Sequence, residues 1–213
     1  MSTPDQKYAT IHYHDYLQLD KILGAQHLRS AELEEKPAHE ELLFIIVHQV
    51  YELWFKQIGH EVQSVIDMFK VGNVDERSIG TAVARLNRVV EIQKLLIQQI
   101  LVLETMTALD FLDFRNYLFP ASGFQSFQFR KVETMLGLPE KDRITYNNKH
   151  YASDFGAVQQ TELEHIIASK NTLFGVVEEW LERTPFLDFG DFNFLAHYRK
   201  AVGKMLDKEQ AAI

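Results

Sequence analysis

The longest apolar stretch of the chain is HEELLFIIVHQVYELWFKQIGHEVQSVIDMF, at residues 39–69. It has no proline and one glycine, and its first turn contains two glutamates, which favour the positive end of a helix dipole. Because residues four apart share one face of a helix, His48 lies on a stripe with Phe44 and with Tyr51 or Glu52. A histidine this deep in an apolar helix needs a hydrogen-bonding partner. The stretch fits either a core histidine tied to a neighbouring helix or a histidine that serves a functional site.

A second long helical pattern, from about Asp75 to Glu104, follows a break at residues 71–74. Two helices of about 30 residues joined by so short a break predict an antiparallel hairpin about 45 Å long. No run of alternating β-branched residues typical of strands occurs. The expected fold is therefore all-α, a helical bundle built on the long antiparallel hairpin, with residues 1–213 forming a single all-helical domain. Shorter helices are expected at about 14–24, 108–118, 124–136, 161–167, 172–183 and 192–213, with loops at 30–38 and 138–156.

Capping signals delimit several of these helices. Thr107, followed three residues later by Asp110, has the pattern of a capping box. Gly137 is expected to end the 124–136 helix. Asn171 and Asp191 are expected to cap the last two helices at their N-terminal ends.

The composition excludes several classes of function. A net charge of -8 leaves no basic surplus for phosphates, so the sequence disfavours a nucleic-acid partner. The chain has no cysteine, which excludes disulfides and thiolate metal sites. No apolar run is long enough to span a membrane and the start, MSTPDQKYAT, is polar, so we expect a cytoplasmic protein without a membrane partner. The sequence is still helical in character at Ile213, which favours the N-terminal portion of a longer polypeptide.

The segment FLDFRNYLFPASGFQSFQ, residues 111–128, carries the most suggestive polar groups. Arg115 lies among aromatic residues, either as a surface residue with a packed stem or as a bidentate clamp for a carboxylate. Ser122 and Gly123 fit either a plain turn before a helix or a hydroxyl and backbone amides offered to a ligand. The chain has no Walker loop, GxGxxG, GxSxG or HExxH motif, which argues against the chemistries that those motifs serve.

Three segments together resemble the tryptophan 2,3-dioxygenase family. They are HYHDYLQLDKIL at 12–23, LLFIIVHQVYELWFKQIGHE at 42–61 and FRNYLFPASGFQSFQFR at 114–130, in the order that the family has them. The resemblance implies an all-helical homotetramer that binds haem b (heme b). It also implies that the enzyme opens the indole ring of L-tryptophan with O₂, giving N-formylkynurenine, the first step of the kynurenine pathway of tryptophan degradation.

The resemblance also implies roles for particular residues. His48 matches the distal histidine that hydrogen-bonds the indole nitrogen, which we interpret as a positioning role, and Arg115 matches the arginine that clamps the substrate carboxylate. Phe111 stands where some members carry tyrosine, so a hydroxyl contact is absent there. An N-terminal arm, residues 1–30, is expected to pack on a neighbouring subunit and close its active site. The substrate-side positions implied are Phe44, Ile45, Ile46, Val47, His48, Phe111, Arg115, Ser122, Gly123 and, from the arm, Tyr13, Tyr16 and Leu17.

The chain departs from the family pattern in its metal ligand. The family's proximal haem ligand lies in a W-R-x-R-H-type motif, followed by a Gly-Thr-Gly loop that meets the substrate ammonium, and the chain has neither. His197, in FLAHYRKAV, is not expected to replace that ligand. The sequence therefore predicts no metal ligand within the chain, and haem for the complete protein. Two other interpretations stay open: a non-catalytic helical module that binds an amino acid or assembles with partners, and a related haem enzyme acting on another indole.

Overall fold

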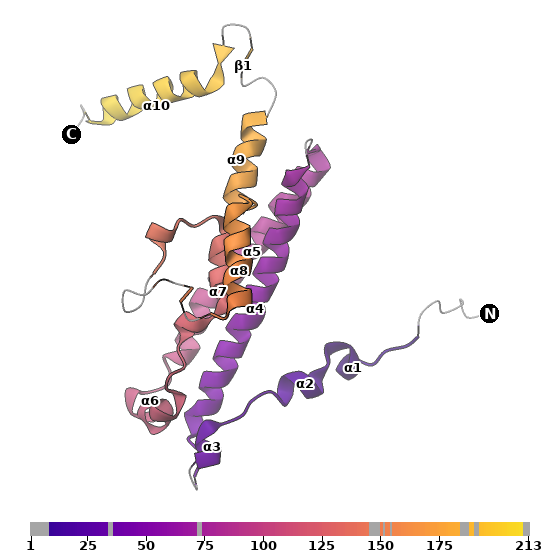
Figure 1. The fold of residues 1–213 in the computed structure, drawn as a ribbon, viewed down its shortest axis with the longest axis vertical. Coiled ribbons are helices and arrows are strands. Elements are labelled where there is room, and N and C mark those ends of the chain that lie inside the picture. The colour runs from indigo at the N-terminus through magenta and orange to yellow at the C-terminus, as the bar shows by residue number, and fades with distance from the viewer. Residues whose placement is uncertain are drawn as a thin grey trace, which may run out of the picture. The chain divides into compact units, whose positions relative to one another are not determined.

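Two long helices carry the fold: α4 spans His39–Lys70 and α5 spans Glu76–Leu103 (Figure 1). The apolar stripe of α4 and the absence of proline from it favour a helix of this length. A two-residue strand pair, β1 at Asp188–Phe189 and β2 at Phe192–Asn193, is the one exception to helix and coil within the described residues. The all-α fold class is confirmed. The computed structural model describes residues 9–33, 36–71, 74–144, 150, 152–153, 155–183, 188–189 and 192–210.

The chain divides into two compact units, and α4 and α5 contribute to both. Unit 1 consists of Met1–Trp54 and Lys94–Gly123, and unit 2 consists of Phe55–Gln93 and Phe124–Ile213. Besides its parts of α4 and α5, unit 1 contains α1 (Tyr13–Leu17), α2 (Leu19–Leu23), α3 (Arg29–Leu33), α6 (Ala108–Arg115) and the 3₁₀ turn η1 (Asn116–Leu118). Unit 2 contains α7 (Phe127–Leu136), η3 (Glu140–Asp142), α8 (Ala157–Ala168), α9 (Leu173–Arg183), the strand pair and α10 (Phe194–Gln210). The short turn η2, Gly123–Gln125, lies where the two units join in sequence.

Unit 2 holds a buried charge on α4. The Glu61 carboxylate is 4% exposed and accepts hydrogen bonds from Arg88 on α5 (2.6 Å) and from Gln57 (2.7 Å). Burial raises the pKa of Glu61, but the hydrogen bond and charge of Arg88 and the hydrogen bond of Gln57 outweigh burial, so the pKa lies below its ordinary value. The carboxylate is therefore ionised at neutral pH and links α4 to α5. The neighbouring positions Ile58, Val62, Val65 and Ile66 are buried apolar side chains.

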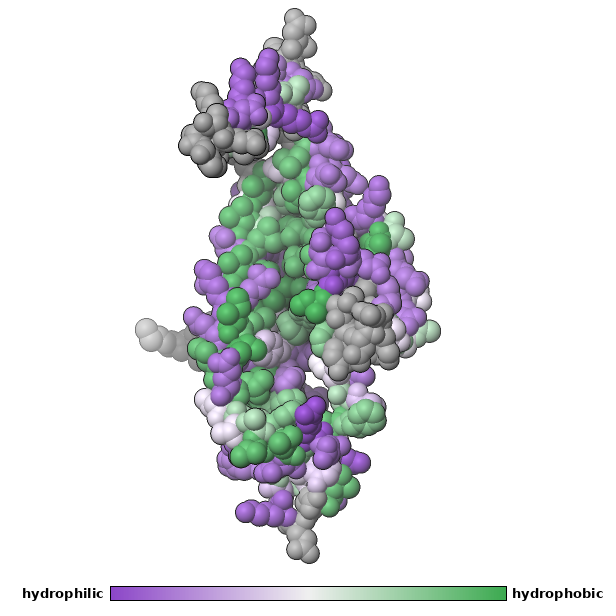
Figure 2. Space-filling view, turned by 90° about the vertical axis from the view of Figure 1, so that its left-hand side faces the viewer, coloured by the Kyte–Doolittle hydropathy of each residue, from purple (hydrophilic) through white to green (hydrophobic). Residues whose placement is uncertain are grey.

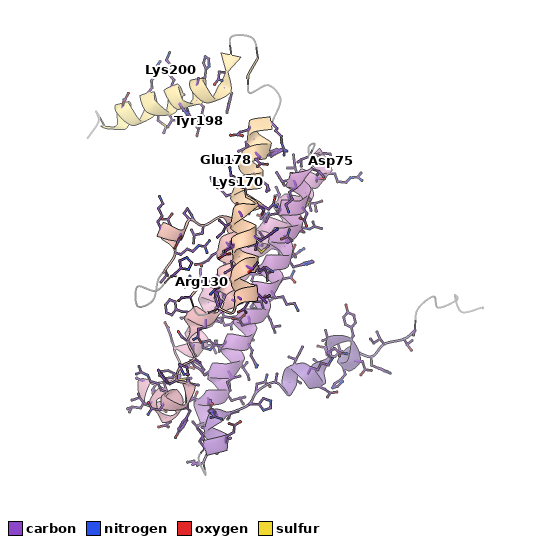
Figure 3. All side chains as sticks on the ribbon, in the orientation of Figure 1. Asp75, Arg130, Lys170, Glu178, Tyr198 and Lys200 are labelled. Carbon is purple, nitrogen blue, oxygen red and sulfur yellow. The ribbon has the colours of Figure 1, made fainter. Side chains whose placement is uncertain are left out.

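A buried cation, Arg130, fastens α7 within unit 2 (Figure 3). Its guanidinium donates to Glu133 (2.8 Å) and to the Ile144 carbonyl (3.0 Å), and it lies 5.5 Å from the centre of the Phe129 ring. Gly137 ends α7 with φ 91°, and a β-carbon there would lie 2.8 Å from a side-chain carbon of α9, so a glycine is required. The predicted C-cap at Gly137 is confirmed.

Several predicted helix boundaries and caps were wrong. The helix expected at 14–24 is broken at Gln18, whose φ of 52° separates α1 from α2. Residues 30–33 belong to α3, Arg29–Leu33, where a loop was expected. The N-cap of α9 is Thr172, whose hydroxyl accepts from the Gly175 amide at 3.0 Å, rather than Asn171. Asn193 accepts from the third amide of its helix, Ala196, at 2.7 Å, while the expected cap Asp191 lies outside the described residues.

Apolar side chains also lie on the outside of these helices, and Figure 2 shows hydrophobic residues gathered in a band on one face. Exposed examples on α5 are Val83, Val90, Ile97 and Leu101. Among the described residues no single helix is long and apolar enough to cross a membrane. Taken together, the bent pair Arg77–Leu103 and Ala108–Leu118 has the length and composition of a membrane span.

Candidate functional site

His48 lies half-buried on the unit 1 part of α4, and its ring is oriented by its own helix. Nδ1 lies 2.7 Å from the carbonyl oxygen of Phe44, one turn earlier. A carbonyl oxygen can only accept a hydrogen bond, so Nδ1 carries the proton and donates it. In the neutral ring the other nitrogen, Nε2, is then a hydrogen-bond acceptor. The partner that burial requires is therefore on the same helix, not on a neighbouring one.

An aromatic cluster surrounds one side of this imidazole. The Phe44 ring centre lies 4.1 Å from that of His48 and 5.8 Å from that of Phe111 on α6. Phe114, fully buried, completes the cluster at 5.6 Å from Phe44 and at 5.3 Å, edge to face, from Phe111. Such offset and edge contacts are favourable packing between rings. The cluster gives His48 an apolar wall built from α4 and α6.

Arg115 is the last residue of α6 and is exposed. It lies one turn after Phe111, so the two side chains share a face of the helix. The start of α6 is fixed by the predicted capping box, in which Thr107 accepts from the Asp110 amide (3.2 Å) and Asp110 accepts from the Thr107 amide (3.1 Å). Within the described chain, no hydrogen bond or ion pair engages the Arg115 guanidinium. Its five N–H groups are therefore open to a bidentate anion such as a carboxylate.

Ser122 and Gly123 follow η1 at the end of unit 1. Ser122 is half-buried, and Gly123 is exposed with no atom within 4 Å of the place where a β-carbon would stand. The backbone there is open to close approach. No recorded contact joins either residue to His48, so their place at the same site stays a prediction. The remaining predicted positions on α4 are Ile45 (half-buried), Ile46 (exposed) and Val47 (buried).

The predicted arm residues are exposed in this chain. Tyr13 is 74% and Tyr16 71% exposed on α1, while Leu17 is half-buried, and no recorded contact brings them to His48. Figure 1 shows α1 and α2 extending away from the end of α4 that carries α3. Packing of this arm on a neighbouring subunit, and the expectation of a single domain, stay predictions.

Comparison with known proteins identifies the family. The family model described as tryptophan 2,3-dioxygenase matches residues 2–213, nearly the whole chain. The chain belongs to the tryptophan 2,3-dioxygenase family. The protein of that name from Bdellovibrio bacteriovorus is 54% identical over 203 residues, which cover 95% of this chain and 56% of the relative. That from Mus musculus is 52% identical over 198 residues, 92% of this chain and 48% of the relative, and that from Dictyostelium discoideum is 46% identical over 201 residues, 93% and 49%.

The chain thus spans about half the length of the tryptophan 2,3-dioxygenases that it matches. The matched region contains His48, Phe111 and Arg115 together with the other predicted substrate-side positions. The family assignment therefore covers the part of the chain in which the aromatic cluster and the guanidinium lie.

Haem is the cofactor that the tryptophan 2,3-dioxygenase family implies, and a haem site needs an axial ligand beside an apolar pocket. Unit 1 supplies the apolar wall of Phe44, Phe111 and Phe114 and one imidazole. The recorded contacts of His48 are with Phe44 alone, and they bring no second histidine to it. Over the residues that the structure describes, no group of three or more His, Asp or Glu side chains could hold a metal ion. An apolar wall with one imidazole suits the substrate side of a haem pocket, and the expectation that this chain lacks the axial ligand stays a prediction.

No pattern in the sequence indicated a polar cluster at the root of the arm. Glu41 on α4 is 1% exposed, and its carboxylate accepts from the amides of Arg29 (2.7 Å) and Ser30 (2.9 Å) at the start of α3. The Ser30 hydroxyl donates to the same carboxylate and accepts from the Ala38 amide at 2.9 Å. Glu41 thus caps a helix other than its own and fastens the segment that leads to the arm.

Proposed function

We propose that this chain is the substrate-positioning part of a haem-dependent tryptophan 2,3-dioxygenase, which opens the indole ring of L-tryptophan with O₂ to give N-formylkynurenine. The observation that carries the proposal is the geometry of His48, whose Nδ1 donates to the Phe44 carbonyl at 2.7 Å and leaves Nε2 as an acceptor beside an aromatic wall. An indole is an apolar ring with one N–H donor, and this arrangement matches both properties.

Each residue has a separate task in positioning the substrate. The rings of Phe44 and Phe111 contact each other and offer flat apolar surface to the indole. His48 accepts the indole N–H at Nε2, which fixes the rotation of the ring in its plane. Arg115 receives the amino-acid carboxylate with two parallel hydrogen bonds. Because Phe111 has no hydroxyl, the carboxylate depends on Arg115 more than it does where a tyrosine stands.

The reaction needs little acid or base chemistry from these residues. Both atoms of O₂ enter the product and no proton is gained or lost overall. Because an indole can react without full deprotonation, we assign His48 to orienting the substrate and not to removing its proton. Haem b, when bound, supplies the activation of O₂. The contribution of this chain is to hold the indole C2–C3 bond in one place and to exclude water from it, which is the proximity part of catalysis.

The assembly and location follow from the same proposal. We take the complete protein to be a cytoplasmic homotetramer with L-tryptophan and O₂ as its substrates, without nucleic acid or membrane as a partner. The exposed tyrosines of α1 support an arm that packs on a neighbouring subunit, since two aromatic side chains on one short helix are otherwise left in water.

The test uses the complete protein, supplied with haem, a reductant and L-tryptophan under ¹⁸O₂. The expected product is N-formylkynurenine with label in both added oxygen atoms, detected by mass spectrometry. Formation of product with one labelled oxygen, or no product while tryptophan binds in calorimetry, would refute the dioxygenase and favour an amino-acid-binding module. Replacing L-tryptophan with other indoles in the same assay separates a tryptophan enzyme from one that acts on another indole.

A further inference from the structure

Among the described residues, the hydrogen bond and the ring contact of His48 both come from its own helix. Its recorded contacts are the Phe44 ring at 4.1 Å and the Phe44 carbonyl at 2.7 Å, both on α4. These contacts orient the imidazole on α4 but do not set where α4 stands relative to α6, which carries Phe111 and Arg115. Something else must fix the rotation and register of α4, because a slip of one residue moves a side chain by about 1.5 Å and turns it by about 100°.

Two hydrogen bonds between α4 and α5 flank His48 within unit 1. The Tyr51 hydroxyl donates to the Leu96 carbonyl at 2.6 Å, and Gln99 donates through Nε2 to the Val47 carbonyl at 3.3 Å. The two bonds are reciprocal, since each helix supplies one side-chain donor and one backbone acceptor. Val47 directly precedes His48, and Tyr51 follows it by three residues, so the bonds bracket the histidine on either side.

Backbone acceptors make this pair a positional constraint. A backbone carbonyl inside a helix has a fixed direction, unlike a side chain. Each bond therefore fixes a side chain of one helix relative to the backbone of the other. Leu96 is buried and the Tyr51 and Gln99 side chains are half-buried, so water competes weakly for these bonds. Burial also raises the pKa of Tyr51, and the hydroxyl therefore remains a donor at neutral pH.

We propose that Tyr51 and Gln99 are positioning residues that act through His48, holding its Nε2 at the place where the indole N–H of the substrate is received. The proposal rests on the proposed function for the identity of the substrate, although the constraint on His48 itself does not. The aromatic contact between Phe44 and Phe111 then fixes α4 on the side that faces α6, and the two hydrogen bonds fix it on the side that faces α5.

The first experiment measures the His48 ring without turnover. Protein labelled with ¹⁵N-histidine is studied by NMR, and the His48 signals are identified by their loss in His48→Ala. We expect the Nδ1–H tautomer in every variant, because the Phe44 carbonyl lies on the same helix as His48. In Tyr51→Phe or Gln99→Leu we expect the His48 ring signals to shift, because the imidazole moves with α4 relative to the aromatic rings of α6. The matched control Tyr198→Phe removes a hydroxyl from an exposed tyrosine of α10 in unit 2 and leaves the signal unchanged (Figure 3). Unchanged His48 ring signals in a folded Tyr51→Phe protein overturn the proposal.

The second experiment separates positioning from general stability. 1-Methyltryptophan lacks the indole N–H, so His48 cannot receive it. Tyr51→Phe should lower kcat/KM for tryptophan about fivefold and leave that for 1-methyltryptophan unchanged, and the effect should vanish in a His48→Ala background. An equal loss on both substrates, or an additive loss in the double variant, overturns the proposal. If the ring signal responds as expected but the unsubstituted protein does not oxidise tryptophan, the proposed function fails while the positioning of His48 stands.

Discussion

Glu41 offers the sharpest test of how this chain holds its N-terminal arm. Replacing Glu41 with alanine removes the acceptor for two backbone amides and one hydroxyl, at a position 1% exposed. A hydrogen bond to a charged group contributes about 1.5–3 kcal/mol, and each buried donor that is left without an acceptor costs about 1–3 kcal/mol. Glu41→Gln keeps the shape and one acceptor oxygen, so its cost should be about half of that.

The stability lost in Glu41→Ala should first be seen as local opening of α3. This helix has five residues and depends on Glu41 for its first amides, so it can detach before the rest of unit 1 unfolds. Hydrogen exchange at the amides of Arg29 and Ser30 should therefore accelerate by at least 100-fold in Glu41→Ala, which corresponds to about 2.7 kcal/mol. Urea denaturation measures how much of this loss also lowers the free energy of global unfolding.

Glu40 is the matched control for this experiment. It lies in the same first turn of α4, and its recorded ion pair is with the exposed His39 at 4.0 Å, so Glu40→Gln should change stability by less than about 0.5 kcal/mol. If Glu41→Ala leaves exchange at Arg29 and Ser30 as slow as in the unsubstituted protein, the cap on α3 is not held by Glu41 and the reasoning is wrong.

Four further outcomes are expected. Arg115→Ala should raise KM for tryptophan about 10- to 100-fold in steady-state kinetics, with Arg115→Lys in between, and an unchanged KM would exclude the carboxylate clamp. His48→Ala should keep haem and partial activity, whereas complete loss of turnover with haem retained would refute a positioning role. Glu61, whose pKa is lowered in the folded protein, stabilises it above the pKa of the unfolded chain and loses that effect as pH falls through the folded value, so urea midpoints should decline in acid and Glu61→Gln should flatten that decline. Gly137→Ala should lower the melting temperature, since φ is 91° and the new β-carbon clashes at 2.8 Å, while Gly80→Ala, with open space on α5, should raise stability by about 0.5–1 kcal/mol.

Short sequence motifs correctly predicted the helix ends that are stabilised by residues close in sequence. The capping box of Thr107 and Asp110 and the left-handed glycine at Gly137 are encoded within a few residues, and both are confirmed. The two long helices were predicted because their apolar spacing extends over many turns. In such places propensity, pattern and cap favour the same structure, so the sequence is sufficient.

The missed elements depend on residues distant in sequence. The α3 segment RSAEL has little apolar content and was expected to be a loop, yet Glu41, twelve residues after Arg29, supplies the cap that its first amides need. The break at Gln18 arises because this residue adopts the left-handed conformation, and no glycine there predicted it. The pattern placed His48 on a stripe with Phe44, but the bond from the ring to the Phe44 carbonyl depends on a rotamer that spacing does not determine.

The polar groups of α4 show where a ligand is required. Glu41 receives amides and a hydroxyl, Tyr51 donates to a carbonyl and Glu61 is paired with a guanidinium, so each of these groups is satisfied by the chain itself. His48 differs, because its Nδ1 is engaged and no recorded partner from the described residues reaches its Nε2. A half-buried acceptor beside aromatic rings is unfavourable unless water or a ligand donates to it. The cost of leaving Nε2 unpaired falls when an indole N–H arrives, so a ligand with that donor gains affinity over an analogue without it.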